Sequence, residues 1–171
     1  MEATSRPSRL ESFANLATII VSLVLTVVLI KVFLLPQSSP MSGRAESRVG
    51  MSLKQSLPDV DWAKNKRTLV LAVSTQCHYC TESAPFFQRI QKERPEGLKM
   101  VAVLPQAVDE GRKYLDGEGV HVDDVKQATL STIGVTGTPT MLLVDGKGPV
   151  AKVWEGKLQP DQEAGVLAAL K

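Results

Sequence analysis

Two cysteines, Cys77 and Cys80, are the residues whose type and spacing could do redox chemistry. They are the only cysteines of the 171-residue chain, and two residues separate them. A thiolate, not a thiol, attacks a disulfide, so a working cysteine needs a lowered pKa. Two intervening residues on a first helical turn would bring Cys80 within disulfide reach of Cys77. The pair therefore predicts a dithiol in which Cys77 attacks a substrate disulfide and Cys80 resolves the mixed disulfide.

The elements around the pair support this interpretation. The apolar, β-rich run Thr68–Ser74 predicts a buried strand, and helical spacing of Phe86, Phe87 and Ile90 predicts a helix over 80–94. Cys77 would then lie at the amino end of a helix, where free N–H groups and partial positive charge favour a thiolate. A protonated His78 beside it would favour the thiolate further.

Two other interpretations of the cysteine spacing need no redox chemistry. The pair could be half of a zinc site, but zinc takes about four ligands, and only His78 and His121 remain as further cysteine or histidine candidates. Two unrelated buried cysteines are the other alternative. A structural disulfide framework is excluded, because no further cysteine exists to pair. We expect no metal and no cofactor, since a dithiol is its own redox group.

Strand and helix signals alternate from Gly50 onward, which predicts an α/β layered domain. The expected elements after the first helix are a strand over 98–104, a helix over 106–115, a short strand over 120–125, a short helix over 126–133, a strand over 140–144, its hairpin partner over 150–155 and a final helix from Pro160. The predicted order is β-α-β-α-β-α-β-β-α, with the cysteines where the first strand meets its helix.

An apolar run over 13–35 precedes this domain, and residues 16–30 carry no charge. Such a run is long enough to cross a hydrocarbon core of about 30 Å. A cleaved signal peptide is the alternative, but the run exceeds the usual ~7–15-residue signal core and no Ala-x-Ala site follows it. We therefore predict a cytoplasmic tail over 1–12, a membrane anchor over 13–35, a flexible linker over 36–49 and a folded domain over 50–171.

Charge gives less information. The net charge of +2 is too small to indicate a nucleic-acid surface. Positive residues on the two sides of the apolar run are nearly balanced, so the positive-inside rule does not decide the topology.

The segment from Thr68 to Lys171 resembles thioredoxin-fold proteins at several points, which occur in the family's order. They are the strand followed by Cys77-His78-Tyr79-Cys80, the helix-kinking Pro85, the cis-proline-like loop Gly137-Thr138-Pro139-Thr140, and the hairpin ending in Glu155-Gly156-Lys157 before a last helix ending LAALK. The resemblance implies a central mixed sheet flanked by helices.

The roughly 35 residues between Val103 and Pro139 exceed the spacing of plain thioredoxin and imply an extra helix–strand insertion. This looks like the membrane-anchored TlpA/ResA-like branch of bacterial thiol–disulfide oxidoreductases. In that branch a single-pass anchor holds the domain on the extracytoplasmic face of the cytoplasmic membrane, and we adopt this localisation as an expectation.

The resemblance also implies site residues. Pro139 would be cis and packed against the cysteines, and the Thr138 backbone would pair with an extended substrate segment. An ordinary trans proline is the alternative. Tyr79 would be exposed beside the disulfide and add to the substrate surface. Glu82 could act with His78 in tuning the cysteine pKa or relaying a proton, or be a solvated surface residue.

Several positions depart from the family pattern. Gln76 replaces the usual Trp before the first cysteine, the intervening dipeptide is His-Tyr instead of Gly-Pro, Leu71 stands where thioredoxin has its buried acid, and Ser83 stands where the anchored reductases often have Glu. The His-Tyr dipeptide resembles isomerase-like members, so it leaves the redox direction open.

The predicted function is reduction of disulfides in extracytoplasmic proteins, for example apocytochrome c, with electrons from a membrane donor of the DsbD/CcdA type. A disulfide oxidase or isomerase is the first alternative. A thiol peroxidase is the second, with Ser74 in its Thr/Ser slot but Val70 where that family has proline. A redox-inactive binding scaffold is the third. His121 beside Asp123 and Asp124 reads either as a relay or as a surface loop.

Overall fold

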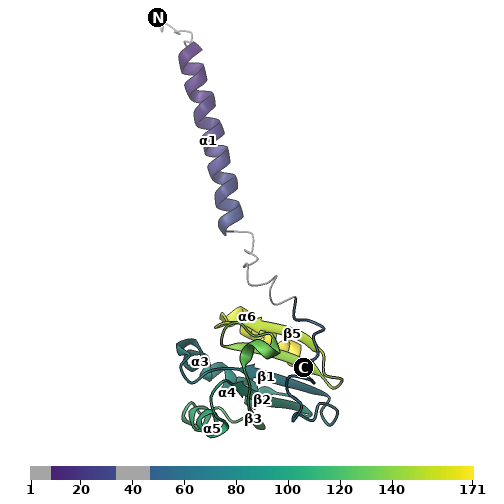
Figure 1. The fold of residues 1–171 in the computed structure, drawn as a ribbon. Coiled ribbons are helices and arrows are strands. Elements are labelled where there is room, and N and C mark those ends of the chain that lie inside the picture. The colour runs from purple at the N-terminus through teal and green to yellow at the C-terminus, as the bar shows by residue number, and fades with distance from the viewer. Residues whose placement is uncertain (1–8, 34–46) are drawn as a thin grey trace, which may run out of the picture. The chain divides into compact units, whose positions relative to one another are not determined.

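The computed structural model describes residues 9–33 and 47–171, and the chain forms two compact units, residues 1–39 and 40–171. The first contains helix α1 (Arg9–Phe33), drawn in purple in Figure 1. Within the described residues, no helix meets the length and apolarity needed to span a membrane. Residues 9–12 of the predicted tail belong to α1, so the helix begins earlier than the anchor predicted over 13–35. The rest of the predicted tail, the end of the predicted anchor and most of the predicted linker lie outside the described residues.

A five-stranded mixed sheet forms the centre of the second unit, in the order β3-β2-β1-β4-β5 (Figure 1). Its strands are β1 (Arg67–Ala72), β2 (Leu98–Leu104), β3 (Asp124–Gln127), β4 (Thr140–Asp145) and β5 (Val150–Glu155). The strand pairs β1/β2 and β2/β3 are parallel, whereas β1/β4 and β4/β5 are antiparallel. The predicted mixed sheet is therefore confirmed.

Alternate residues of β1 enter two different cores, because successive side chains of a strand point to opposite faces. Leu69 and Leu71 pack with the helices that cover one face. Val70 and Ala72 pack with the irregular segment 53–62 and with Ile133 on the other face. Burial on both faces explains why β1, β2 and β4 read as continuous apolar runs instead of alternating ones.

The helix predicted over 80–94 is two helices, α3 (His78–Glu82) and α4 (Ala84–Glu93), separated at Ser83. Pro85 stands in the first turn of α4 and has no N–H to continue the α3 hydrogen-bond ladder. At the break, the Ser83 hydroxyl donates to the Tyr79 carbonyl oxygen at 2.7 Å, beside the bond from the Ser83 N–H to the same oxygen. The predicted kinking role of this proline matches the break.

Helix α5 (Val108–Gly117) and strand β3 lie between β2 and β4 in the chain, as the predicted insertion requires. The predicted bounds of the strand and the short helix that follow α5 are wrong. The strand predicted over 120–125 begins at Asp124, and the helix predicted over 126–133 is only a 3-10 turn, η1 (Leu130–Ile133). Lys126 and Gln127 pair with Val103 and Leu104 of β2, and this tertiary pairing outweighs their local preference for helix.

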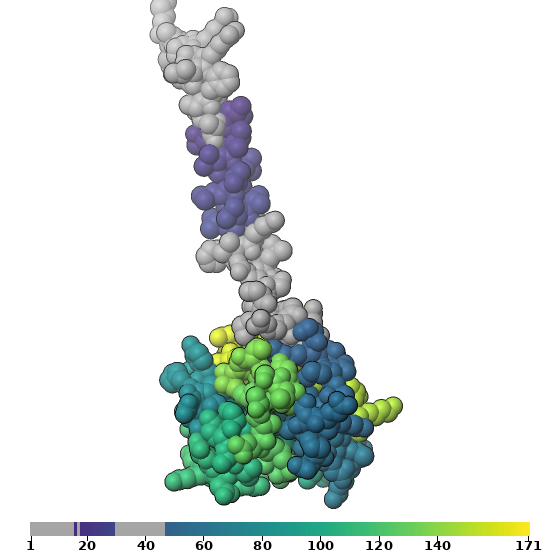
Figure 2. All heavy atoms as spheres, in the orientation of Figure 1, coloured from purple at the N-terminus to yellow at the C-terminus, as the bar shows by residue number. Residues whose placement is uncertain are grey.

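The final helix α6 (Pro160–Leu170) begins at the predicted proline and buries the predicted inner face of Val166, Leu167 and Leu170. At the other end of the domain, Arg48 is only 4% exposed although it falls within the predicted linker over 36–49. The packed domain thus includes Arg48. Figure 2 shows the chain that follows residue 47, in blue, beside the green segment of residues 120–140.

Candidate functional site

Cys77 and Cys80 form a disulfide where β1 leads into α3, with their Cα atoms 5.2 Å apart. Cys77 is the N-cap residue of α3 and has an extended backbone, so its sulfur faces the start of the helix. The Cys80 N–H donates to Cys77 Sγ at 3.2 Å. A donor in this position favours negative charge on Cys77 once the disulfide is reduced.

The two sulfurs differ in their access to solvent. Cys80 is 1% exposed and lies within the core on the helical face of the sheet, whereas Cys77 is only partly buried. Tyr79 between them is 58% exposed. An incoming disulfide can therefore reach Cys77, while Cys80 is placed to attack the Cys77 sulfur from inside.

The loop of residues 136–139, which we call the 136–139 loop, lies against this pair. The Thr138 carbonyl oxygen is 3.3 Å from Cys77 Sγ, and the Thr138–Pro139 peptide bond is cis. Pro139 is buried and its carbonyl oxygen accepts from the Gly156 N–H at 2.7 Å. Sequence and structure agree on this geometry, while the role of Thr138 and Pro139 in substrate binding stays a prediction.

His78 and Glu82 lie on the exposed side of α3, one helical turn apart. Glu82 Oε1 is 3.2 Å from His78 Nε2, and Glu82 Oε2 accepts from Lys157 Nζ at 3.0 Å. The hydrogen bond from Lys157 lowers the pKa of the Glu82 carboxyl below its ordinary value, and the positive charges of Lys157 and His78 lower it further. Glu82 is therefore ionised near neutral pH, and its lowered pKa makes it a weaker base than an ordinary carboxylate.

Several residues that hold the site could not be identified from the sequence. Lys157 was recognised only as part of a family pattern, and nothing in its spacing from Glu82 indicated contact. On the α5 side, Thr75 donates to Glu110 at 3.0 Å and Gln106 donates to Ser74 Oγ at 3.0 Å. These contacts fix the loop before Cys77 to the inserted segment. The only sequence feature that indicated these contacts is the length of the insertion between Val103 and Pro139.

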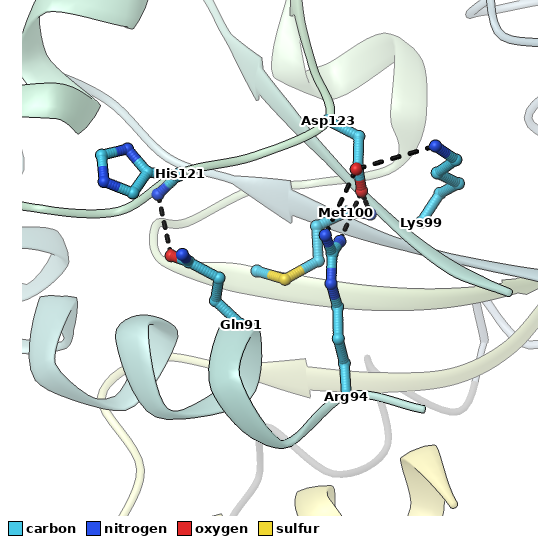
Figure 3. A network of polar contacts seen from close by, with 6 residues as sticks. All are labelled: Gln91, Arg94, Lys99, Met100, His121 and Asp123. Carbon is cyan, nitrogen blue, oxygen red and sulfur yellow. Dashed lines mark hydrogen bonds and ion pairs between the residues drawn. The ribbon is translucent and has the colours of Figure 1, made fainter. Parts of the chain in front are cut away.

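His121 does not form a relay with the neighbouring aspartates. Its side chain is 67% exposed and its ring lies 3.7 Å from Asp116, while its backbone N–H donates to Gln91 (Figure 3). Asp123 instead pairs with Arg94 and accepts from the Met100 N–H at 2.8 Å. Among the described residues, no cluster of His, Cys, Asp and Glu could hold a metal ion.

Residues 61–171 match the model of a family described as the thioredoxin-like domain. The chain belongs to the thioredoxin-like family. The match covers the whole sheet, both cysteines and the 136–139 loop. A comparison with curated protein sequences returned no match.

Solved structures with the same fold include several thiol–disulfide exchange proteins. The provisionally named thiol:disulfide interchange protein DsbE of Chlorobium tepidum is 25% identical, with a TM-score of 0.52 over 65% of this chain and 84% of that one. A thioredoxin-family thiol:disulfide interchange protein of the same organism is 26% identical, with a TM-score of 0.50 over 64% and 83%. StoA of Bacillus subtilis is 15% identical, with a TM-score of 0.52 over 63% and 84%, and shows the fold alone.

Together with the Cys77–Cys80 pair, these likenesses identify a thiol–disulfide oxidoreductase of the thioredoxin-like DsbE/ResA type. The resemblance to the TlpA/ResA-like branch is thereby confirmed. Protein thiols and disulfides are the substrate class of such enzymes.

Proposed function

We propose that this chain is a membrane-tethered reductase of disulfides in extracytoplasmic proteins. The observation that carries the proposal is the placement of Cys77, which is partly accessible and within 3.3 Å of the Thr138 carbonyl oxygen, above a buried Cys80. The arrangement gives one sulfur for attack, one for resolution and a backbone beside them for substrate.

The reaction moves two electrons. The Cys77 thiolate attacks one sulfur of a substrate disulfide, forms a mixed disulfide and releases the other substrate sulfur as a thiolate that takes up a proton. Cys80, deprotonated, then attacks Cys77 Sγ and releases the second substrate thiol. The substrate disulfide is reduced and the Cys77–Cys80 disulfide is formed. A membrane dithiol donor of the DsbD/CcdA type would reduce the enzyme again.

Substrate recognition would use the backbone at Thr138 and the exposed ring of Tyr79. An extended substrate segment can hydrogen-bond to a free backbone edge in the manner of strand addition, which requires little from the substrate's side chains. Tyr79 would add apolar contact area beside the disulfide, since aromatic rings contribute much of the energy at protein interfaces. Such a surface suits an unfolded exported protein, with apocytochrome c as one example.

The membrane tether is proposed from the sequence of α1. Residues 16–30 carry no charge, and the large apolar side chains that the structure describes there are about half exposed or more. Apolar surface of this extent is stable in contact with lipid rather than water. The proposed topology has the amino terminus in the cytoplasm and the thioredoxin-like domain on the extracytoplasmic side.

Disulfide oxidation or isomerisation is the second candidate, and the His78-Tyr79 dipeptide favours it. The reduction potential of the Cys77–Cys80 pair separates the candidates, measured on the full chain in detergent with glutathione buffers. A potential below about −220 mV supports the reductase, whereas one above about −180 mV supports an oxidase or isomerase. If no disulfide forms at any ratio of the buffer, the proposed function is wrong. Turnover of hydrogen peroxide by the same sample would favour a thiol peroxidase instead.

A further inference from the structure

Arg48 and Glu155 form an ion pair inside the domain, with side chains only 5% and 8% exposed. A buried charge is costly unless it is paired and hydrogen-bonded, and removing one partner of such a pair leaves the other charge uncompensated. The two residues are 107 positions apart in the chain. This pair therefore fixes two distant segments relative to each other.

The backbone of the segment 48–53 holds Arg48 against the sheet. The Gly50 N–H donates to the Val150 carbonyl at 2.8 Å, and the Val150 N–H donates back to Met51 at 2.9 Å. The segment thus runs along the start of β5 as a short added edge. The Arg48 side chain also lies beside Gly134, whose φ of +72° ends η1.

Both ends of the 136–139 loop contact a residue of this ion pair or its chain neighbour. At its start, Arg48 Nη2 donates to Thr136 Oγ1 at 3.3 Å. At its end, Glu155 pairs with Thr140 in the β4/β5 ladder, and the next residue, Gly156, donates to Pro139. The planar guanidinium of Arg48 can donate to the Glu155 carboxylate and the Thr136 hydroxyl at once, because its donors have a fixed fork geometry.

We propose that Arg48 is a positioning residue for substrate: paired with Glu155, it fixes the 136–139 loop so that the Thr138 backbone is presented to an extended substrate beside Cys77. The inference rests on the proposed function, because it assumes that a protein disulfide is reduced at this backbone. It assigns no chemistry to Arg48, which touches neither cysteine.

The test compares a protein substrate with a small one on the full chain in detergent, with dithiothreitol as the reductant. Insulin supplies an extended polypeptide around its disulfides, whereas hydroxyethyl disulfide has no backbone to pair. For Arg48→Met we expect the KM for insulin to rise about fivefold, equal to about 1 kcal/mol of lost binding. The kcat for insulin, the rate with hydroxyethyl disulfide and the equilibrium constant with glutathione stay within about twofold of wild type.

Two further variants keep the test independent of folding. Arg48→Lys retains the charge opposite Glu155 but not the fork to Thr136, and its KM for insulin should lie between wild type and Arg48→Met. Thr136→Val removes only the acceptor at the start of the loop and should raise the KM in the same direction, by about twofold. Arg94→Met serves as the matched control, because it breaks an ion pair with Asp123 that lies on other elements.

The outcomes distinguish a failure of the role proposed for Arg48 from a failure of the proposed function. If wild type reduces insulin but the KM values of Arg48→Met and Thr136→Val match that of Arg94→Met, the inference alone is overturned. The same holds if activity on insulin and on hydroxyethyl disulfide falls in parallel, which would indicate a general structural role. If wild type does not reduce insulin, the proposed function fails and the inference falls with it.

Discussion

At the scale of single residues, the disulfide joins two sulfurs in unequal surroundings. Cys80 is fully enclosed by the core, and Cys77 is reached from solvent beside the exposed Tyr79. Exposure decides which sulfur meets a substrate, because the rate of thiol–disulfide exchange depends on access to the attacking sulfur. The order of attack by Cys77 and resolution by Cys80 follows from this difference.

Replacing Cys80 by Ser should trap the enzyme on its substrate. Cys77 can still attack, but no second sulfur is present to release it, so a mixed disulfide accumulates. The adduct is measured as a slower band on a non-reducing gel after incubation of the reduced variant with insulin, and dithiothreitol removes it. The matched variant Cys77→Ser should give almost no adduct, since its remaining thiol is buried. Equal trapping by both variants would contradict the assigned roles.

At the scale of elements, Asp123 joins the end of α4 to the start of β2 and to the turn before β3. Its carboxylate pairs with Arg94 and accepts from the Met100 N–H, while its own N–H donates to the Met100 carbonyl at 2.8 Å (Figure 3). Partial burial by itself raises the pKa of Asp123, but the hydrogen bonds from Arg94 and Met100 and the charges of Arg94 and Lys99 outweigh it. The net result is a pKa below the ordinary value of 3.8.

Replacing Asp123 by Asn should therefore destabilise the domain in a pH-dependent way. A carboxyl whose folded-state pKa is lowered stabilises the fold above its unfolded-state pKa, and this contribution disappears as the pH falls through the folded-state pKa. We expect a loss of about 1 kcal/mol in the free energy of unfolding at pH 7, because the site is partly solvated. The loss should shrink below about pH 4.

Urea unfolding of the wild type and Asp123→Asn at several pH values measures this difference. Glu96→Gln, at an exposed position nearby, is the control and should change stability little at any pH. A destabilisation by Asp123→Asn that stays constant down to pH 3 would show that the carboxylate charge is not its cause.

Two glycines on different elements should respond to alanine with opposite signs. A Cβ on Gly146, in the β4–β5 turn, would lie 2.8 Å from the Asn65 backbone oxygen, so Gly146→Ala forces the chain before β1 to move. We expect a loss of about 1–3 kcal/mol. Gly165 is exposed in the interior of α6 with open space around it, and Gly165→Ala should stabilise by about 0.5–1 kcal/mol. Thermal unfolding of both variants checks the signs.

At the scale of the whole molecule, the proposed tether can be tested apart from the redox chemistry. The full chain should sediment with membranes and resist extraction with alkaline carbonate, because about 20 apolar residues hold a chain in the bilayer. A variant lacking residues 1–35 should appear in the soluble fraction and retain reduction of hydroxyethyl disulfide. A full chain that stays in the supernatant would contradict the tether. Digestion of the domain by protease added to intact spheroplasts would support its placement on the extracytoplasmic side.

The sequence alone determined the parts of this protein that depend on local pattern. The continuous apolar runs predicted β1, β2 and β4, and the cysteine spacing predicted the disulfide. Each of these features depends on residues that are close together in the sequence, and the covalent chain fixes their spacing. The kink at Pro85 was expected only from the family resemblance, and the helical spacing had predicted a single helix over 80–94. Recognition of the 136–139 loop needed the family resemblance in addition, because a proline alone does not indicate a cis bond.

Only the tertiary structure decided which distant residues meet. The pairs Arg48–Glu155 and Glu82–Lys157 join residues 107 and 75 positions apart. The same is true of β3, whose bounds were set by pairing with β2, and of η1, where a helix had been predicted. Contacts of this kind depend on how the sheet brings distant segments together. A charged residue has the same sequence signal whether it is solvated or buried against a partner, so the sequence does not distinguish the two.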